Sequence, residues 1–168
     1  MAVWHQMTES HLPGVLRVAG EVHADLPEHE TVVTERLKLF PDGCLVLVEH
    51  GKVGGYIVSF PIRHSKPPPL NALLGEIPSD ADQYYLHDLA LLPAVRGRGA
   101  AAEGIGKILE VAERYPTTCL TSVYGTVSFW RQYGFVPEPV DGILEEKLRT
   151  YGGDATFMTR KNKNVQVS

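Results

Sequence analysis

The stretch from Tyr84 to Tyr115 reads YYLHDLALLPAVRGRGAAAEGIGKILEVAERY, and the fold class follows from it. Its first part, Tyr84 to Leu92, is apolar and aromatic, which predicts a strand with both faces largely covered. Its second part, Ala100 to Arg114, carries apolar residues three or four apart on one face and charged pairs four apart on the other, which predicts a helix. A strand that passes through a turn into a helix indicates a protein of the α/β or α+β class.

The turn between this strand and this helix is Arg96-Gly97-Arg98-Gly99. It leaves free backbone N–H groups at the start of a helix and flanks them with two guanidinium groups. Both kinds of donor bind phosphate oxygens. The turn is therefore predicted to be a phosphate site.

Two common phosphate loops do not fit this turn. A P-loop requires a hydroxyl after its lysine, and the nearest frame has Ile108 there. A dinucleotide fingerprint is formally matched by Gly97, Gly99 and Ala102, but it also requires an acidic residue roughly 20 positions later. The segment 117–124 contains none. The hypothesis that the chain is a nicotinamide- or nucleotide-binding protein therefore rests on a partial match alone.

The acyl-CoA loop R-x-x-G-x-(G/A) fits better, with Arg96, Gly99 and Ala101 directly after a strand that ends in LAL. Here the chain resembles the GNAT superfamily of acetyl-CoA-dependent N-acetyltransferases. A second segment, Phe129 to Phe135, reads FWRQYGF and resembles the F-Y-x-x-x-G-F helix of the same superfamily. A predicted strand from Thr118 to Val123 separates the two motifs, in the order and at about the distance that the family has.

The resemblance implies a mixed, largely antiparallel sheet flanked by helices, in which the central strand and the next one splay apart to admit acetyl-CoA. The rest of the chain suits this order. The sequence predicts strands at 2–7, 44–49, 52–61 and 155–160, helices at 8–24, 32–40 and 143–150, an edge strand or loop at 136–140, and a frayed polar tail at 161–168.

Composition restricts the class of partner. The 168 residues, 43% of them hydrophobic, suit one domain that spans 1–168. The net charge of −4 gives no reason to expect binding to nucleic acid or to an anionic membrane surface. Cys44 and Cys119 lie in apolar runs and are expected to be buried, reduced thiols. The chain shows neither a signal peptide nor an apolar run of about 18 residues, so a cytoplasmic location is expected.

The resemblance also assigns a cofactor site. Acetyl-CoA is the expected co-substrate, and no metal is expected. In the family the pantetheine arm lies along the central strand, which implies the backbone of Leu89, Ala90 and Leu91. The phosphates are implied to bind the loop and the start of the helix, at Arg96, Gly97, Arg98, Gly99, Ala100 and Ala101. Phe129 and Trp130 are expected to pack along the cofactor.

The chemistry requires a group that takes a proton from the attacking ammonium ion. His87 and Asp88 interrupt the apolar strand, and strand alternation predicts that they point to opposite faces, with His87 on the face of Tyr85 and Leu89. Serotonin-type N-acetyltransferases have a related H-L-H-A-L-A-V strand whose second histidine falls on His87. An imidazole suits proton relay at neutral pH. His87 is therefore the first choice for the base, and a structural histidine at the strand start is the alternative.

The expected proton donor to the departing thiolate is missing. The family often uses the tyrosine of F-Y-x-x-x-G-F, and Trp130 occupies that position here. Either the thiolate leaves without an acid or another residue serves. Tyr124 is favoured over Tyr133, because a tyrosine beside Gly134 and Phe135 is more often a packing residue.

Two further segments border the expected acceptor side. An acidic, histidine-containing cluster surrounds Pro27, and its spacing matches no metal motif, which predicts a solvated linker. Alternatively, Glu28 or Glu30 attracts a cationic amine. The segment 62–83 is long and contains three consecutive prolines, so it either shapes the amine pocket or is a flexible surface loop.

The resemblance thus implies an N-acetyltransferase that moves an acetyl group from acetyl-CoA to a primary amine by direct attack in a ternary complex. The acceptor is a small-molecule or peptide amine, and the sequence does not choose among a polyamine, an antibiotic amine, an amino acid and a protein N-terminus. A homodimer is compatible with the resemblance. A non-catalytic acyl-CoA sensor is the alternative, favoured by the missing tyrosine at position 130.

Overall fold

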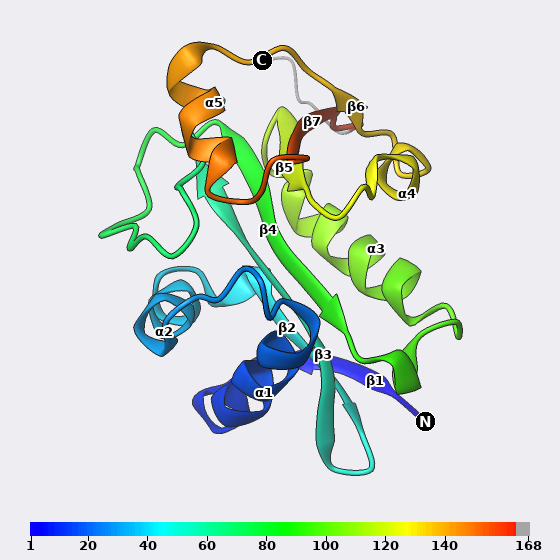
Figure 1. Cartoon of the computed structure of the whole chain (residues 1–168). Coiled ribbons are helices and arrows are strands. Elements are labelled where there is room, and N and C mark those ends of the chain that lie inside the picture. The colour runs from blue at the N-terminus through cyan, green and yellow to red at the C-terminus, as the bar shows by residue number, and fades with distance from the viewer. Residues whose placement is uncertain (164–168) are drawn as a thin grey trace.

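The computed structural model describes residues 1–163, which form a seven-stranded sheet in the order β1-β2-β3-β4-β5-β7-β6 (Figure 1). Every neighbouring pair is antiparallel except β4 and β5. The predicted mixed, mostly antiparallel sheet is confirmed. The strands are β1 Val3–Gln6, β2 Cys44–Glu49, β3 Lys52–Ile62, β4 Gln83–Leu91, β5 Thr117–Ser122, β6 Val136–Pro137 and β7 Thr156–Lys161. The helices are α1 Leu12–Val22, α2 Glu30–Leu39, α3 Ala100–Ala112, α4 Val127–Arg131 and α5 Gly142–Arg149.

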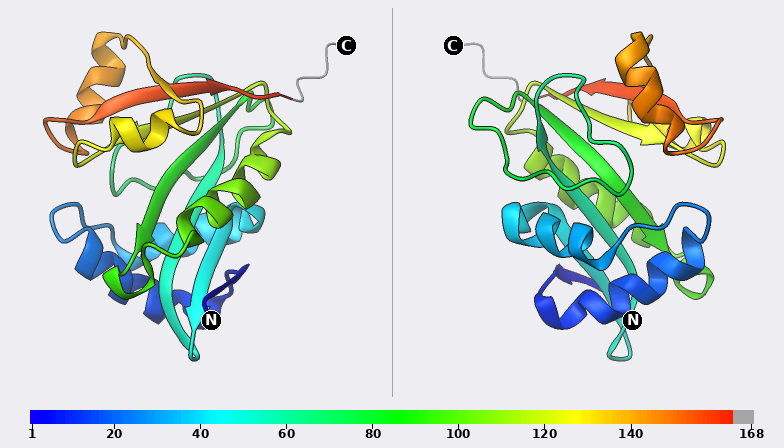
Figure 2. Two further views of the ribbon diagram at one scale, coloured as in Figure 1. Left: turned by 90° about the vertical axis from the view of Figure 1, so that its right-hand side faces the viewer. Right: turned by 60° about the vertical axis from the view of Figure 1, so that its left-hand side comes forward.

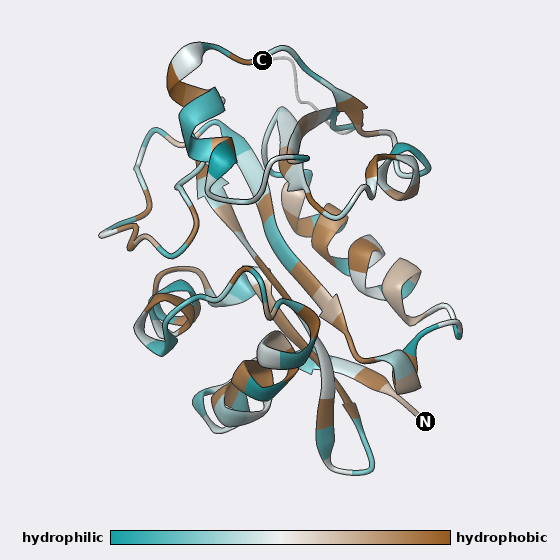
Figure 3. Cartoon of the chain, in the orientation of Figure 1, coloured by the Kyte–Doolittle hydropathy of each residue, from teal (hydrophilic) through white to brown (hydrophobic). Residues whose placement is uncertain are grey.

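Helices cover both faces of the sheet, with α1 and α2 on one face and α3 on the other (Figure 2). Two hydrophobic clusters result. The first contains Val15 and Val18 of α1 together with Phe60 and Tyr85 of the sheet. The second joins α3 to the opposite face of the sheet through Ile105, Ile108, Ile57 and Leu86. In Figure 3 a hydrophilic stretch interrupts β4 between two hydrophobic ones, so the middle of this central strand is polar.

The sheet opens between β4 and β5. These parallel strands pair only where Gln83–Leu86 lies beside 117–120. Beyond Leu86 β4 runs away from β5 and β7 (Figure 2). The remainder of β4 keeps β3 on one edge and has an unpaired edge on the other. This is the splayed arrangement that the GNAT resemblance implied.

A β-bulge lies in the middle of β4. Leu86 is opposite Ser59 and Asp88 is opposite Val58, so His87 is an extra residue with no partner on β3. A bulge rotates the residues around it and cancels the normal alternation of faces. Both His87 and Asp88 therefore turn to the face of α1 and α2, whereas Leu89 packs on the α3 side. The prediction that His87 and Asp88 point to opposite faces, with His87 beside Leu89, is wrong for this reason.

The chain is ordered beyond the last predicted strand. Lys161 closes β7, and the side chain of Asn162 is buried. Its amide donates hydrogen bonds to the carbonyl oxygens of Ala112 and Tyr115, both 2.8 Å away, at the end of α3. The predicted frayed tail is therefore wrong for 161–162, and its last residues, 164–168, lie outside the described part of the chain.

Both cysteines, Cys44 and Cys119, are free and buried, as predicted. Burial raises the pKa of each thiol, so neither is poised to react. Within residues 1–163, the helices are too short or too polar to cross a membrane.

Candidate functional site

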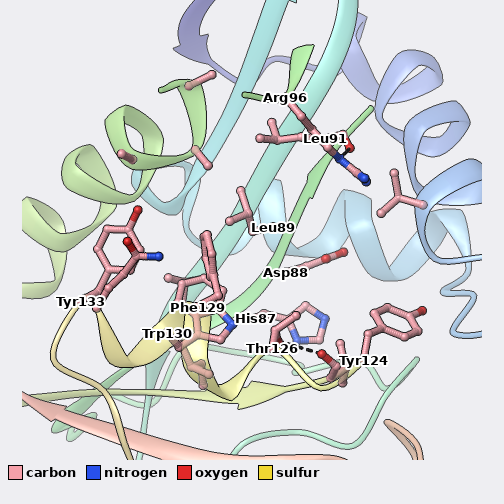
Figure 4. A pocket seen from close by; sticks show the side chains of 18 of the residues that line it. His87, Asp88, Leu89, Leu91, Arg96, Tyr124, Thr126, Phe129, Trp130 and Tyr133 are labelled. Carbon is pink, nitrogen blue, oxygen red and sulfur yellow. Dashed lines mark hydrogen bonds between the residues drawn. The ribbon is translucent and has the colours of Figure 1, made fainter. Parts of the chain in front are cut away.

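A cavity of about 730 Å³ fills the gap between the diverging ends of β4 and β5. It is also bounded by the start of α3, by α4 and by the end of α1. The cavity brings together most of the site residues that the sequence predicted, namely His87, Leu89, Leu91, Arg96, Gly97, Gly99, Ala100, Ala101, Tyr124, Phe129 and Trp130. Figure 4 shows their order: Arg96 and Leu91 lie at one end, His87, Thr126 and Tyr124 at the other, and Leu89 and Asp88 between them.

Two predicted residues do not line this cavity. The side chain of Ala90 is buried in the hydrophobic cluster on the opposite face of the sheet. The guanidinium of Arg98 is turned outward and makes two hydrogen bonds, of 3.0 and 3.1 Å, to the carboxylate of Glu49 at the end of β2. In this structure Arg98 is therefore paired with Glu49 on the surface and is not part of the cavity wall.

The turn before α3 has the geometry of an anion site. Gly97 and Gly99 have φ angles of +77° and +76°, in the left-handed region that favours glycine. The helix begins at Ala100, and the N–H groups of its first turn have no acceptor within the helix. Arg96 lies beside them, with its Nε donating to the carbonyl oxygen of Leu91 at 2.8 Å. Its remaining guanidinium nitrogens make no hydrogen bond within residues 1–163.

The start of α3 is held from below by Trp4 of β1. The indole Nε1 donates to the carbonyl oxygen of Ala100 at 2.8 Å. Gly104, one turn later, has no room for a side chain, because a Cβ there would lie 2.5 Å from the Trp4 ring. This close approach fixes where the helix begins and hence where its N–H groups point.

The unpaired edge of β4 offers backbone groups to the cavity. The N–H of Leu92 donates to the carbonyl oxygen of Gly54 on β3. Because peptide groups alternate along a strand, Leu91 and Leu89 turn theirs to the opposite edge. The bond from Arg96 to the Leu91 carbonyl agrees with this direction.

A titratable cluster lies halfway along the cavity. The Asp88 carboxylate accepts a hydrogen bond from the Tyr56 hydroxyl at 2.6 Å, and its other oxygen lies 2.7 Å from Nε2 of His23. The His23 ring does not aim an N–H at this oxygen, so the contact is not an aligned hydrogen bond, and it becomes an ion pair when His23 is protonated. Burial alone would lower the pKa of His23, but the charges of Asp88 and Glu28 and the backbone of Leu89 outweigh it, and the pKa is raised.

The sequence did not single out His23, which was assigned to a solvated linker. Only 13% of its side chain is exposed. One signal was available: His23 follows Ala19 by four residues and Val15 by eight, so it extends the apolar face of α1. Within residues 1–163 no group of three or more His, Cys, Asp or Glu side chains is arranged to hold a metal ion.

His87 lies deeper than Asp88. Its side chain is 2% exposed, and its Nε2 is 2.8 Å from Oε1 of Glu28. Glu28, also assigned to the solvated linker, is only 11% exposed. Burial would raise the pKa of Glu28, but the charge and hydrogen bond of His87, the N–H of Asn71 and the charge of Arg36 outweigh it and lower the pKa to about 2. Glu28 is therefore a buried carboxylate that stays ionised.

Tyr124 forms the wall opposite Asp88. Its ring stacks on His23 with the planes 9° apart and the centroids 5.8 Å apart, and 48% of the residue is exposed. Burial and the negative charges of Asp25, Asp88 and Asp154 raise the pKa of its phenol. The hydroxyl therefore stays protonated and available as a donor over the whole neutral range.

The sequence profile of the acetyltransferase (GNAT) family matches residues 4–135, which include the cavity and most of the sheet. The chain belongs to the GNAT acetyltransferase family. Acyl transfer from acyl-CoA is the general chemistry of this family. No curated protein sequence matches the chain significantly.

Solved GNAT structures share the fold over almost the whole chain. Ard1 from Thermoplasma volcanium has a TM-score of 0.70 at 17% identity, covering 96% of this chain and 98% of that one. The ribosomal-protein-S18-alanine N-acetyltransferase from Escherichia coli has a TM-score of 0.68 at 14% identity, covering 100% and 97%. GphF, a GNAT-like decarboxylase in complex with isobutyryl-CoA, has a TM-score of 0.78 at 14% identity, covering 96% and 100%. At these identities the likeness concerns the fold alone.

The residues present fit the acyl-CoA that a GNAT fold implies. The donors at one end, backbone N–H groups and the Arg96 guanidinium, are those that bind phosphate. The unpaired edge at Leu89 and Leu91 can pair with an extended amide-containing chain, as another strand would. Trp130 takes the position of the family's tyrosine and is packed among Phe129, Tyr133 and Phe135. Its indole N–H is too weakly acidic to protonate a thiolate.

Proposed function

We propose that the protein is an N-acetyltransferase that moves an acetyl group from acetyl-CoA to a primary amine by direct attack in a ternary complex. One observation carries the proposal: a single cavity contains, in a row, a helix start with free N–H groups, an unpaired strand edge and a carboxylate–imidazole pair. Each matches one requirement of the reaction: holding the nucleotide, aligning the thioester and removing a proton.

Cofactor binding would use the groups that the sequence predicted. The N–H groups from Gly97 to Ala101 and the guanidinium of Arg96 would hold the phosphates. The backbone of Leu89 and Leu91 would pair with the pantetheine amides, and Phe129 and Trp130 would pack against the arm. Ala90 would contribute to the strand only, because its side chain faces away.

The proton acceptor that we propose is the pair formed by Asp88 and His23. The sequence favoured His87, but its imidazole is 2% exposed and is engaged by Glu28, whereas 19% of the Asp88 side chain is exposed. The ring nitrogens of His23 are buried, so a proton from the cavity reaches them through Asp88. His87 would then act behind Asp88. While His23 is neutral, the Asp88 carboxylate can take the incoming proton from the amine and pass it to the His23 imidazole 2.7 Å away, which suits general-base catalysis near neutral pH.

The bond changes are those of a direct acyl transfer. The amine nitrogen attacks the thioester carbon, and its proton passes to the Asp88–His23 pair. The tetrahedral oxyanion would accept a hydrogen bond from a backbone N–H on the unpaired edge of β4. As the C–S bond breaks, Tyr124 would donate a proton or a hydrogen bond to the thiolate in place of the absent tyrosine at Trp130.

The charge around the acceptor end supports a cationic amine. Asp88 lines the cavity next to this end, Glu28 lies outside its wall against His87, and Asp25 and Asp154 are near enough to Tyr124 to raise its pKa. These carboxylates attract an ammonium ion and repel a carboxylate. The site therefore favours amine acetylation over decarboxylation of a carboxylated acyl-CoA, the class of reaction for which GphF is named.

We further propose one acyltransferase domain over 1–168 and a cytoplasmic location.

The test is a calorimetric titration of acetyl-CoA, with NADH as the control, followed by thiol release from acetyl-CoA in the presence of a panel of amines. We expect acetyl-CoA to bind, NADH not to bind, and thiol release to require an amine. Binding without release for every amine would favour the sensor, and competition by NADH would favour a nucleotide-binding protein. Loss of carbon dioxide from a carboxylated acyl-CoA without amine would favour a decarboxylase.

A further inference from the structure

Two residues hold the buried imidazole of His87 from opposite sides. Oε1 of Glu28 lies 2.8 Å from its Nε2, and the hydroxyl of Tyr151 lies 3.5 Å from its Nδ1. The Tyr151 hydroxyl already donates to the carbonyl oxygen of Pro68, so it can only accept from His87. The rings of Phe60 and Tyr85 complete the surroundings of His87.

The same two residues also hold the long loop between β3 and β4. Oε2 of Glu28 accepts a hydrogen bond from the N–H of Asn71 at 2.9 Å. The Tyr151 hydroxyl donates to the carbonyl oxygen of Pro68 at 2.8 Å. Each residue therefore touches His87 with one atom or lone pair and the loop backbone with another. The loop and the bulge in β4 are joined through these two side chains.

The loop has other anchors that do not reach His87. The carboxylate of Glu35 accepts from the N–H groups of Leu74 and Gly75, and the hydroxyl of Thr150 accepts from the N–H of Leu70 at 2.9 Å. Thr150 follows α5 directly and is exposed. It provides a matched control, because its removal affects the loop at a point next to Tyr151 without touching the imidazole.

His87 is the inserted residue of the bulge, so its anchoring affects the residue after it. Asp88 reaches Tyr56 and His23 only because the bulge turns two consecutive side chains to one face. A buried imidazole that loses its partners is costly, and the strand would relieve that cost by moving. Movement of His87 at this point would carry Asp88 with it.

We propose that Glu28 and Tyr151 are positioning residues that couple the loop 63–82 to the bulge in β4 and thereby hold Asp88 in its place in the cavity. The proposal rests on the proposed acetyltransferase function. Glu28 and Tyr151 act through His87 and touch neither cofactor nor amine. The cofactor end of the cavity is not part of the coupled unit.

The test compares Glu28→Gln and Tyr151→Phe with the controls Glu30→Gln and Thr150→Val. We expect kcat to fall about tenfold or more in the first two variants, since a small misplacement of a reacting group has effects of this size. The acetyl-CoA Kd should stay within about twofold of wild type. Hydrogen exchange measured by mass spectrometry should rise together in the peptides that cover 63–82 and 86–91.

The controls separate coupling from a merely loosened loop. Thr150→Val should raise exchange in the loop peptide alone and leave kcat unchanged, and Glu30→Gln should change neither. An unchanged kcat in both Glu28→Gln and Tyr151→Phe, an equal loss in Thr150→Val, or an unchanged exchange of the β4 peptide would overturn the proposal. If Glu28→Gln does not fold, Tyr151→Phe, which keeps the ring, decides. If the wild-type protein acetylates no amine, the proposed function fails, and the joint response of the two peptides still decides the coupling.

Discussion

The two ends of the cavity are built from different kinds of group. At the cofactor end the donors are mostly backbone N–H groups from one short run, Arg96 to Ala101, and the conformation depends on two glycines. At the acceptor end the groups are side chains that come from α1, from the linker after it, from β4 and from the turn after β5. A site made of backbone in one motif is set by local sequence, whereas a site made of distant side chains is set by packing. The two ends should therefore respond differently to substitution.

The largest effect is expected at Asp88. Asp88→Asn removes the charge that is paired with His23 and leaves the size of the side chain almost unchanged. Loss of a general base typically lowers the rate about 10²- to 10⁴-fold, so kcat should fall by at least about 100-fold. Steady-state kinetics and calorimetry measure kcat and the acetyl-CoA Kd, and the Kd should stay near the wild-type value. Equal losses in both would mean that the two ends are not independent.

Glu28 gives the next largest effect, on stability. Its pKa is about 2 in the folded protein, against a reference value of 4.5, so it stabilises the fold above about pH 4.5, and this contribution is lost as the pH falls toward 2. Glu28→Gln should therefore lower the free energy of unfolding by roughly 1–3 kcal/mol above pH 4.5. Urea unfolding at several pH values measures this difference. A constant difference down to pH 2 would show that the charge of Glu28 is not its cause, and Glu30→Gln should show no such dependence.

The two arginines of the turn before α3 should contribute unequally to acetyl-CoA binding. Arg96 lines the cavity, whereas Arg98 is bound to Glu49 on the outside. Removing one charge-assisted hydrogen bond to phosphate costs roughly 1.5 kcal/mol or about tenfold in affinity. Arg96→Ala should therefore raise the acetyl-CoA Kd about tenfold, and Arg98→Ala less than about threefold. Calorimetry of the two variants decides, and the reverse order would mean that Arg98 leaves Glu49 to bind the nucleotide.

The smallest effect is a shift in the titration of His23. Its pKa is raised in the folded protein because the Asp88 and Glu28 carboxylates outweigh the cost of burial. The corresponding stability is present below about pH 6.5 and is lost as the pH rises through the folded value. NMR titration of the His23 ring should give a pKa above 6.5 in the wild type and a lower one in Asp88→Asn. An unchanged value in that variant would place the main partner of His23 elsewhere.

The difference between the two ends of the cavity also explains which elements and site residues could be predicted from the sequence. The strand, the turn and the helix from Tyr84 to Tyr115 are set by periodicity and by glycines at local positions. Their bounds agree closely with β4 Gln83–Leu91 and α3 Ala100–Ala112. The strands at 44–49 and 52–61 were predicted from local pattern in the same way. His50 and Gly51 between them adopt the left-handed turn that so short a connection requires.

The side-chain arrangement at the acceptor end could not be predicted from the sequence, because it depends on pairing between distant segments. The bulge at His87 is a property of the register between β3 and β4, and no pattern within β4 reveals it. His23 and Glu28 look like solvated polar residues in the sequence, and only the fold gives them Asp88 and His87 as partners. Asn162 was missed for the same reason, since its carbonyl acceptors are at the end of α3.

The chain contains two tryptophans, Trp4 and Trp130, and both adjoin the proposed cofactor site. The Trp4 indole donates to the first carbonyl of α3, and Trp130 lines the cavity. Intrinsic fluorescence is therefore a label-free reporter of this one region of the molecule. Trp4→Phe leaves Trp130 as the single tryptophan, and a change in its emission on adding acetyl-CoA should persist in this variant. Comparison of the wild-type and Trp4→Phe emission would separate contact along the cavity, which Trp130 reports, from tightening of the helix start, which Trp4 reports.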